Sequence, residues 1–293
     1  MQYTSVTADG IQRWGVIEDR DAYLAPQSPD WPATLLELIR SGPDIAADAS
    51  RRLLTGDGER RPVETLELLA PLPRPPRNIM CLGLNYADHA AESQKAKGQD
   101  LARPEHPVVF TKATSSVTGP FADIPLDATI TTQFDWEVEL AVVIGRGGRY
   151  IPEEQALEHV FGYTVINDLS ARDLQFRHKQ FFLGKSLDGG CPMGPTITPV
   201  NAIADPHDLS LWCDVNGYRQ QTGHSSDQIF RIPETIAILS RVMTLEPGDV
   251  IATGTPSGVG FAQNPPRFLQ PGDEVVCGID GIGTIRNRIV AGG

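Results

Sequence analysis

The sequence predicts an α+β protein built mainly from short strands, with few helices. Beyond residue 77, strand-like segments follow one another without the regular strand–helix alternation of a parallel α/β sheet. Two dipeptides typical of tight hairpins, Asp9-Gly10 and Asp280-Gly281, each lie between two such segments. A proline-rich stretch at residues 71–76 separates a small N-terminal part from the rest. Together these observations indicate a strand-rich fold in two parts.

The first 70 residues are predicted to form a small domain. Residues 2–18 are expected to form a strand pair that turns at Asp9-Gly10. Residues 31–40 and 43–54 are expected to be helices, each with a proline near its start, where a missing N–H costs little. Residues 71–76 cannot continue a helix or a central strand, because proline has no backbone N–H to donate. We expect a linker there, followed by a second domain over residues 77–293.

The second domain is predicted to contain further strands and two helices. Alternation and turn residues mark the strands, and a proline near the first position marks each helix. The predicted strands are 78–84, 106–112, 162–168, 248–255 and a hairpin over 273–290, and the predicted helices are 152–160 and 232–243.

Composition restricts the class of protein. The 293 residues are 40% hydrophobic and 21% charged, which is typical of a globular chain. The net charge of −12 argues against nucleic acid or an anionic membrane as the main partner. The four cysteines are scattered, and we find neither a signal peptide nor an apolar run of membrane-spanning length. We therefore expect a cytoplasmic protein that acts on a small molecule.

The most informative stretch is "FDWEVELAVVIG", residues 134–145. Strand alternation places Asp135, Glu137 and Glu139 on one face. Carboxylates at this spacing lie roughly 6–7 Å apart and repel by ~2–3 kcal/mol per pair at an effective dielectric near 20. A positive group or water must therefore offset them. Glu137 and Glu139, with Asp168 at the end of a later strand, would offer the hard oxygen ligands that Mg²⁺ or Mn²⁺ prefers. A solvated strand face with a turn-capping Asp168 explains the pattern equally well, and Asp135, at the strand's outer end, is expected to stay out.

Three other segments could carry chemistry. His89 and Glu92 are three residues apart, so on a helix the carboxylate could orient the imidazole as a base for water; an ordinary surface pair is the alternative. Lys185 follows Gly184, but position 179 is Lys rather than Gly, which excludes a phosphate-binding P-loop. Lys185 is then a candidate cation for a carboxylate or an enolate, or a surface lysine. The glycine-rich segment 252–260 is no nucleophile elbow, yet could bind a carboxylate or form a tight turn.

These segments occur together in a distinctive order: "GLNYADHAAE", "PVVFTK", "DWEVELAVVIG", "NDLSARDLQ", "GKSLDGGCPMGP" and "GDVIATGTPSGVG". As a set they resemble the fumarylacetoacetate hydrolase family, especially its bacterial acylpyruvate hydrolase branch and the fumarylacetoacetate hydrolase domain-containing proteins. The resemblance covers about residues 77–290. It implies a mixed β-sandwich roll in the C-terminal domain, a small N-terminal α/β domain and, usually, a homodimer.

The resemblance also implies roles for individual residues. Glu137, Glu139 and Asp168 would bind Mg²⁺ or Mn²⁺, and His89 would activate water with Glu92 behind it. Lys185 would lie beside the substrate's oxyanion, and the substrate contacts would come from Arg172, Gln175 and Thr255. Asn85 stands where fumarylacetoacetases proper have an aspartate that adds a metal ligand, which counts against fumarylacetoacetate as the substrate.

By resemblance, the expected activity is metal-dependent hydrolysis of the C3–C4 bond of 2,4-diketo acids, giving pyruvate and a carboxylic acid. Other reactions of the same metal-enolate site stay open: decarboxylation of oxaloacetate, and isomerisation or tautomerisation of 2-hydroxy-diene-dioates. They share the metal and differ in whether water is activated. A non-catalytic metal-binding module is the alternative of a different class.

Overall fold

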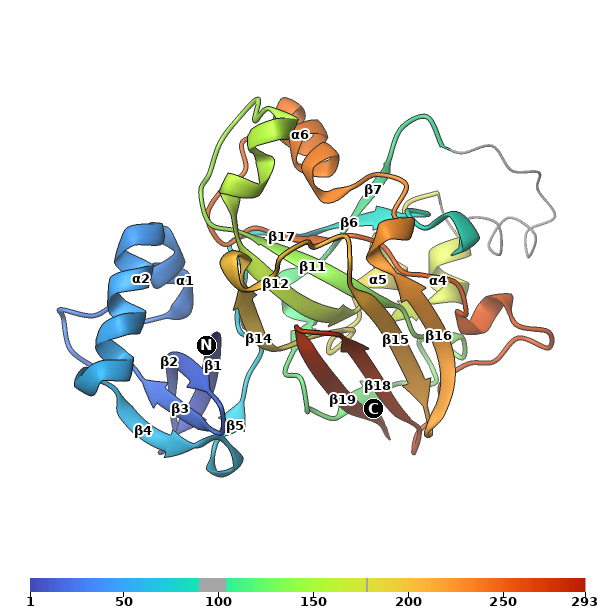
Figure 1. Cartoon of the computed structure of the whole chain (residues 1–293). Coiled ribbons are helices and arrows are strands. Elements are labelled where there is room, and N and C mark those ends of the chain that lie inside the picture. Colours follow the sequence, from blue (N-terminus) through green and yellow to red (C-terminus); the bar gives the residue numbers. More distant parts are fainter. Residues whose placement is uncertain (90–103, 178, 293) are drawn as a thin grey trace.

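The computed structural model describes residues 1–89, 104–177 and 179–292 and confirms the strand-rich α+β class (Figure 1). Within this part of the chain the larger sheet has twelve strands. Ten follow the spatial order β4-β3-β2-β1-β14-β12-β11-β17-β6-β7, with β5 on β1 and β8 on β14. The twelve strands are β1 (Gln2–Ala8), β2 (Ile11–Glu18), β3 (Asp21–Leu24), β4 (Glu59–Pro62), β5 (Glu67–Leu68), β6 (Ile79–Gly83), β7 (Val108–Lys112), β8 (Val117–Thr118), β11 (Val138–Ile144), β12 (Val160–Asn167), β14 (Cys191–Pro199) and β17 (Val250–Ala252).

A second, five-stranded sheet has the order β16-β15-β18-β19-β9 and packs against the first. A short pair, β10 with β13, lies next to the site described below. The bounds of these strands are β9 (Ile124–Leu126), β10 (Phe134–Asp135), β13 (Ser170–Ala171), β15 (Ser210–Val215), β16 (Tyr218–His224), β18 (Glu274–Ile279) and β19 (Gly283–Ala291). The helices are α1 (Leu35–Arg40), α2 (Pro43–Arg52), α4 (Arg172–Arg177), α5 (Phe182–Lys185) and α6 (Ile232–Val242). Within the described residues, no helix is long and apolar enough to cross a membrane.

Both predicted hairpins are confirmed. β1 and β2 pair antiparallel about Asp9 and Gly10, whose φ angles of 52° and 76° are the left-handed values that a two-residue hairpin turn requires. β18 and β19 pair in the same way about Gly281. The predicted helix at 152–160 differs, because Glu153–His159 forms a 3₁₀ helix rather than an α-helix.

The N-terminal strands are hydrogen-bonded to the rest of the molecule. β1 pairs with β14 at Tyr3 and Ile197, so β1 to β4 extend the larger sheet, with α1 and α2 beside them (Figure 1). The chain then passes through the proline-rich residues 71–76 to β6. The division into two domains at this segment stays a prediction.

β11 is buried on both faces, which explains its apolar run. Phe134, Trp136, Val138 and Leu140 join the core between the two sheets, as strand alternation predicts. Ala141 and Val143 face a second core, shared with the N-terminal strands and helices. Alternation places Glu139 on this second face. The acidic residues therefore lie at the end of a central strand, where the chain leaves the apolar core.

Candidate active site

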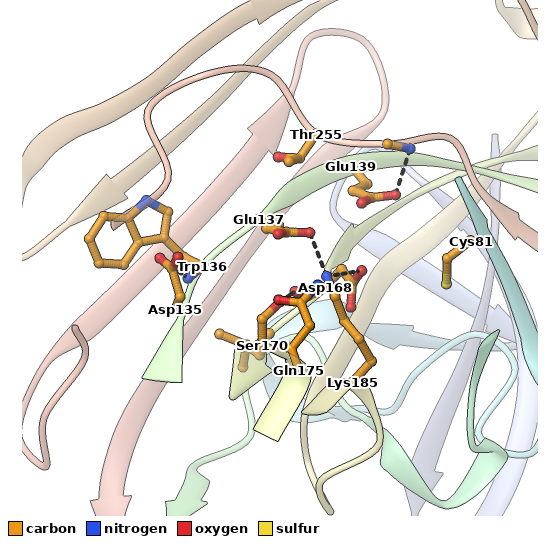
Figure 2. A network of polar contacts seen from close by, with 12 residues as sticks. Cys81, Asp135, Trp136, Glu137, Glu139, Asp168, Ser170, Gln175, Lys185 and Thr255 are labelled. Carbon is orange, nitrogen blue, oxygen red and sulfur yellow. Dashed lines mark hydrogen bonds and ion pairs between the residues drawn. The ribbon is translucent and has the colours of Figure 1, made fainter. Parts of the chain in front are cut away.

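The three predicted metal ligands lie together in the structure (Figure 2). Glu139 lies on β11, Glu137 directly precedes that strand, and Asp168 directly follows β12. β11 and β12 pair antiparallel, and the Asp168 N–H donates to the Glu137 carbonyl at 2.8 Å. All three side chains are buried, and one oxygen from each lies within 4.8 Å of the others. The solvated strand face considered above is therefore not what forms.

Three cations offset this negative charge. The Lys185 ammonium lies 2.7 Å from Glu137 Oε2 and 2.7 Å from Asp168 Oδ2, as Figure 2 shows. The Arg172 guanidinium lies 2.6 Å from Glu137 Oε1. Lys112 lies 2.6 Å from Asp168 Oδ1 and also donates to the Leu169 carbonyl at 3.0 Å. Sequence reasoning missed Lys112, although a lysine that ends the apolar strand "PVVFTK" and is 0% exposed is an unusual residue.

The carboxylates are compensated unequally. Burial would raise the pKa of Glu137, but the charges of Lys185 and Arg172 outweigh it and hold that pKa below its usual range. Burial, with Asp168 and Glu137 nearby, raises the pKa of Glu139 well above its usual value. Among the described residues, the hydrogen bond that Glu139 accepts is the one from the Gly254 N–H, at 2.7 Å. A divalent cation would relieve this excess of negative charge, so the donor set fits Mg²⁺ or Mn²⁺.

Asp135, expected to stay out of the metal site, instead organises the neighbouring chain. Its carboxylate accepts from the Gly260 and Phe261 N–H groups at 2.7 and 3.1 Å, and Arg172 Nε lies 2.8 Å from it. Arg172 Nη1 donates to Gln175 Oε1 at 2.9 Å, and the guanidinium lies 4.4 Å from the centre of the Phe261 ring. Asp135 thus holds the arginine and the 260–262 turn together.

A pocket of about 100 Å³ opens beside the carboxylates. Seven predicted site residues line it: His89, Glu137, Glu139, Arg172, Gln175, Lys185 and Thr255. Asp168 does not, because Lys185 and Lys112 cover it. Phe110, Phe176, Phe181 and Phe261 give the pocket apolar walls. Glu92, predicted to support His89, lies outside the described residues.

The loop that carries Thr255 is held by Asn85, at the position where fumarylacetoacetases proper would have an aspartate. The Asn85 amide donates to the Thr253 carbonyl at 2.7 Å and to the Phe230 carbonyl at 3.0 Å. Gly254 has a φ of +97°, and a Cβ there would come within 2.8 Å of the Asn85 side chain. Glycine is therefore required for the turn that presents the Gly254 N–H to Glu139.

Residues 78–290 match the family described as "Fumarylacetoacetate (FAA) hydrolase C-terminal". The chain belongs to this family. The match covers most of the chain, including the segments that carry the three carboxylates, the three cations and Thr255. The chain is therefore an enzyme of the fumarylacetoacetate hydrolase superfamily.

Two relatives carry the same activity in their names. The chain is 48% identical to oxaloacetate tautomerase YisK of Bacillus subtilis over 268 residues, which are 88% of this chain and 87% of YisK. It is 41% identical to the human mitochondrial oxaloacetate tautomerase FAHD2A over 264 residues, 89% of this chain and 81% of that protein. Among solved structures, a fumarylacetoacetate hydrolase from Exiguobacterium antarcticum superposes with a TM-score of 0.87 at 44% identity, covering 99% of each chain.

These relatives correct the expected reaction. Hydrolysis of the C3–C4 bond of 2,4-diketo acids was the main expectation, and relatives named as oxaloacetate tautomerases overturn it. The physical reason is that one metal-carboxylate site stabilises an enolate in both reactions, and the sequence motifs describe that shared site. The reaction favoured by the relatives was among the alternatives.

A further solved structure bears on the metal. The maleylpyruvate hydrolase of Sphingobium sp. SYK-6, described in complex with manganese(II) and pyruvate, superposes with a TM-score of 0.80 at 29% identity over the full length of both chains. A member of the same fold thus binds a divalent cation together with a keto acid. Within the part of the chain that the structure describes, the buried carboxylates Glu137, Glu139 and Asp168 are the group that could bind one.

Proposed function

We propose that this enzyme is an oxaloacetate tautomerase, which interconverts the enol and keto forms of a four-carbon keto dicarboxylate. The observation that carries the proposal is the pocket: a small cavity with a buried carboxylate cluster on one side and with Lys185 and Arg172 beside it. The two relatives named as oxaloacetate tautomerases support the same substrate.

In this reaction a proton leaves the enol hydroxyl and a proton is added at C3, so no carbon–carbon bond breaks. Glu137, Glu139 and Asp168 would hold a divalent cation, which when bound acts as a Lewis acid on the substrate's carboxylate and adjacent oxygen. Lys185 and Arg172 place fixed positive charge where the oxyanion develops, and such charge is worth most in a site closed to water.

His89 is the proposed proton carrier. Its side chain is buried and lines the pocket together with Glu137 and Glu139. A neutral imidazole can accept a proton at one position of the substrate and return it at another. Gln175 and Thr255 are the proposed polar contacts to the substrate. Glu92, the homodimer and the cytoplasmic location stay predictions.

The test follows the disappearance of the enol isomer and the formation of pyruvate, the product of decarboxylation. The enol form of oxaloacetate would be mixed with the enzyme and Mg²⁺ or Mn²⁺, and the fall in enol absorbance compared with that for the metal ion alone. Pyruvate would be assayed in the same samples. We expect faster ketonisation that a chelator abolishes and fresh metal restores, without pyruvate. Pyruvate formed as fast as the enol disappears would indicate a decarboxylase, and no acceleration with either ion would overturn the proposal.

A further inference from the structure

A second layer of polar contacts lies behind Thr255, and Gln221 is its central residue. Gln221 lies on β16 and is 0% exposed. Its Oε1 accepts from the backbone N–H of Val138 at 3.0 Å, between the two metal-binding glutamates. Its Nε2 donates to the Pro256 carbonyl at 2.9 Å and to Thr255 Oγ1 at 2.8 Å. The side chain thus connects β11 with the loop that carries Thr255.

These partners fix which way the amide points. The Val138 N–H can only donate and the Pro256 carbonyl can only accept, so the Gln221 oxygen must face Val138 and its nitrogen must face the loop. The nitrogen has no lone pair to offer, so Thr255 Oγ1 acts as the acceptor in its contact with Gln221. Among the described residues this is the hydrogen bond that the Thr255 hydroxyl makes, and its proton is left for another acceptor.

The loop has little freedom to turn the hydroxyl elsewhere. It packs directly on β16: a Cβ at Gly258 would lie 2.0 Å from the Gln220 carbonyl, and one at Gly223 would lie 2.4 Å from Pro256. Thr255 is itself 2% exposed and lines the pocket. The Thr255 hydroxyl therefore lies at the pocket wall, with its proton available to an oxygen of a bound substrate.

We propose that Gln221 is a positioning residue that fixes the Thr255 hydroxyl as a hydrogen-bond donor to a carboxylate or enolate oxygen of the bound substrate. The proposal rests on the proposed function for the identity of that substrate. It explains why a fully buried glutamine joins the metal-binding strand to the substrate loop. It also predicts a preference for ligands that present an acceptor oxygen over ligands that present a donor.

The test uses the full-length enzyme and a double-mutant cycle of Gln221→Met and Thr255→Val. Gln221→Met keeps the size of the side chain without its polar groups, and Gln220→Met makes the same change one residue away, on the other face of β16. Binding of oxalate, an unreactive dianion that resembles the carboxylate-enolate half of the substrate, would be titrated calorimetrically with Mg²⁺ present. Mg²⁺ binding alone and KM against kcat for enol-oxaloacetate would be measured in parallel.

We expect Thr255→Val to weaken oxalate binding by about tenfold to a hundredfold, the usual contribution of a hydrogen bond to a charged group. Gln221→Met should have a similar effect, the double variant should be little worse than either, and KM should rise more than kcat falls. Gln220→Met should bind oxalate as the wild type does. Additive losses, or a Gln221→Met variant that weakens Mg²⁺ binding as much as oxalate binding, would overturn the proposal.

Gln221→Glu provides a second route if the methionine variant does not fold. A carboxylate there still accepts from Val138 but turns the Thr255 hydroxyl toward itself, so oxalate binding should weaken in the presence of Thr255 and much less in the Thr255→Val background. Equal weakening in both backgrounds would overturn the proposal. Because oxalate does not react, an inactive wild type with the expected coupling would refute the tautomerase and leave the role of Gln221 intact.

Discussion

Asp135, at the end of β10, and Glu139, on β11, lie four residues apart and are both fully buried, yet their surroundings differ. Asp135 accepts from two backbone N–H groups of the 260–262 turn and pairs with Arg172. Glu139 accepts from the Gly254 N–H and has Asp168 and Glu137 as like-charged neighbours. A buried carboxylate whose charge and hydrogen bonds are matched by groups of the protein itself has a structural role. One left with an excess of negative charge is suited to an added cation.

The largest effect should come from Glu139→Gln, which keeps the shape and removes the charge. We expect kcat/KM for ketonisation to fall by at least ~10³-fold, about 4 kcal/mol, because the metal is lost. The metal-free protein should be more stable by about 1 kcal/mol, since a buried and poorly compensated charge is gone. Urea unfolding after chelation would check the second point. An active variant, or one destabilised without metal, would contradict the comparison.

The opposite result is expected for Asp135→Asn. This change removes one of the two carboxylate partners of the buried Arg172 guanidinium and should lower the free energy of unfolding by about 3 kcal/mol. The loss should be the same with and without Mg²⁺, because Asp135 lies outside the metal cluster. Unfolding curves under both conditions would measure it. A loss seen only in the presence of Mg²⁺ would make Asp135 part of the metal site.

His89→Gln tests whether His89, which lines the pocket, transfers protons without holding the metal. We expect kcat to fall about 100-fold, within the usual range for general acid–base catalysis. The affinity for Mn²⁺, followed by calorimetry, should change less than twofold. Equal losses in kcat and in Mn²⁺ affinity would place His89 among the groups that hold the ion.

The smallest effect concerns the metal itself. At ten times its Kd, Mg²⁺ should stabilise the wild-type protein by ~1.4 kcal/mol, which raises the melting temperature by about 2 °C. The Asp135→Asn variant should show the same rise from a lower starting temperature, and Glu139→Gln should show none. Differential scanning calorimetry of the three proteins would distinguish the role of Asp135 from that of Glu139. A rise in Glu139→Gln would mean that the ion binds elsewhere.

Much of this arrangement could be predicted from local sequence. Strand alternation placed Phe134, Trp136 and Val138 in the core and their acidic neighbours apart from it, and hairpin dipeptides located two turns. Local pattern drew attention to the three carboxylates, to Lys185 and to the glycine-rich segment, but left a metal site and a solvated strand face equally open. The resemblance in the order of motifs favoured the metal site and added Arg172, Gln175 and Thr255.

The remaining features depend on contacts between residues far apart in the chain. Lys112 meets Asp168 although β11, β17 and β6 lie between β12 and β7 in the sheet, and Gln221 meets Thr255 only because β16 packs on the loop after β17. No local pattern encodes such pairs. The reaction was also not predictable, because hydrolysis and tautomerisation require the same cation-binding carboxylates, and the motifs describe only those.

The antiparallel pairing of β11 with β12 brings the three carboxylates together, whereas Lys112, one of the cations that offset them, comes from β7, which is farther away in the chain. Contacts between residues close in the sequence usually form before long-range ones during folding. The carboxylates therefore meet before β7 delivers Lys112, and Arg172 and Lys185, which follow Asp168 in the chain, offset only part of their charge. Refolding in dilute Mg²⁺ should consequently be faster than refolding in chelator, and the ion proposed for the mature site would assist its assembly.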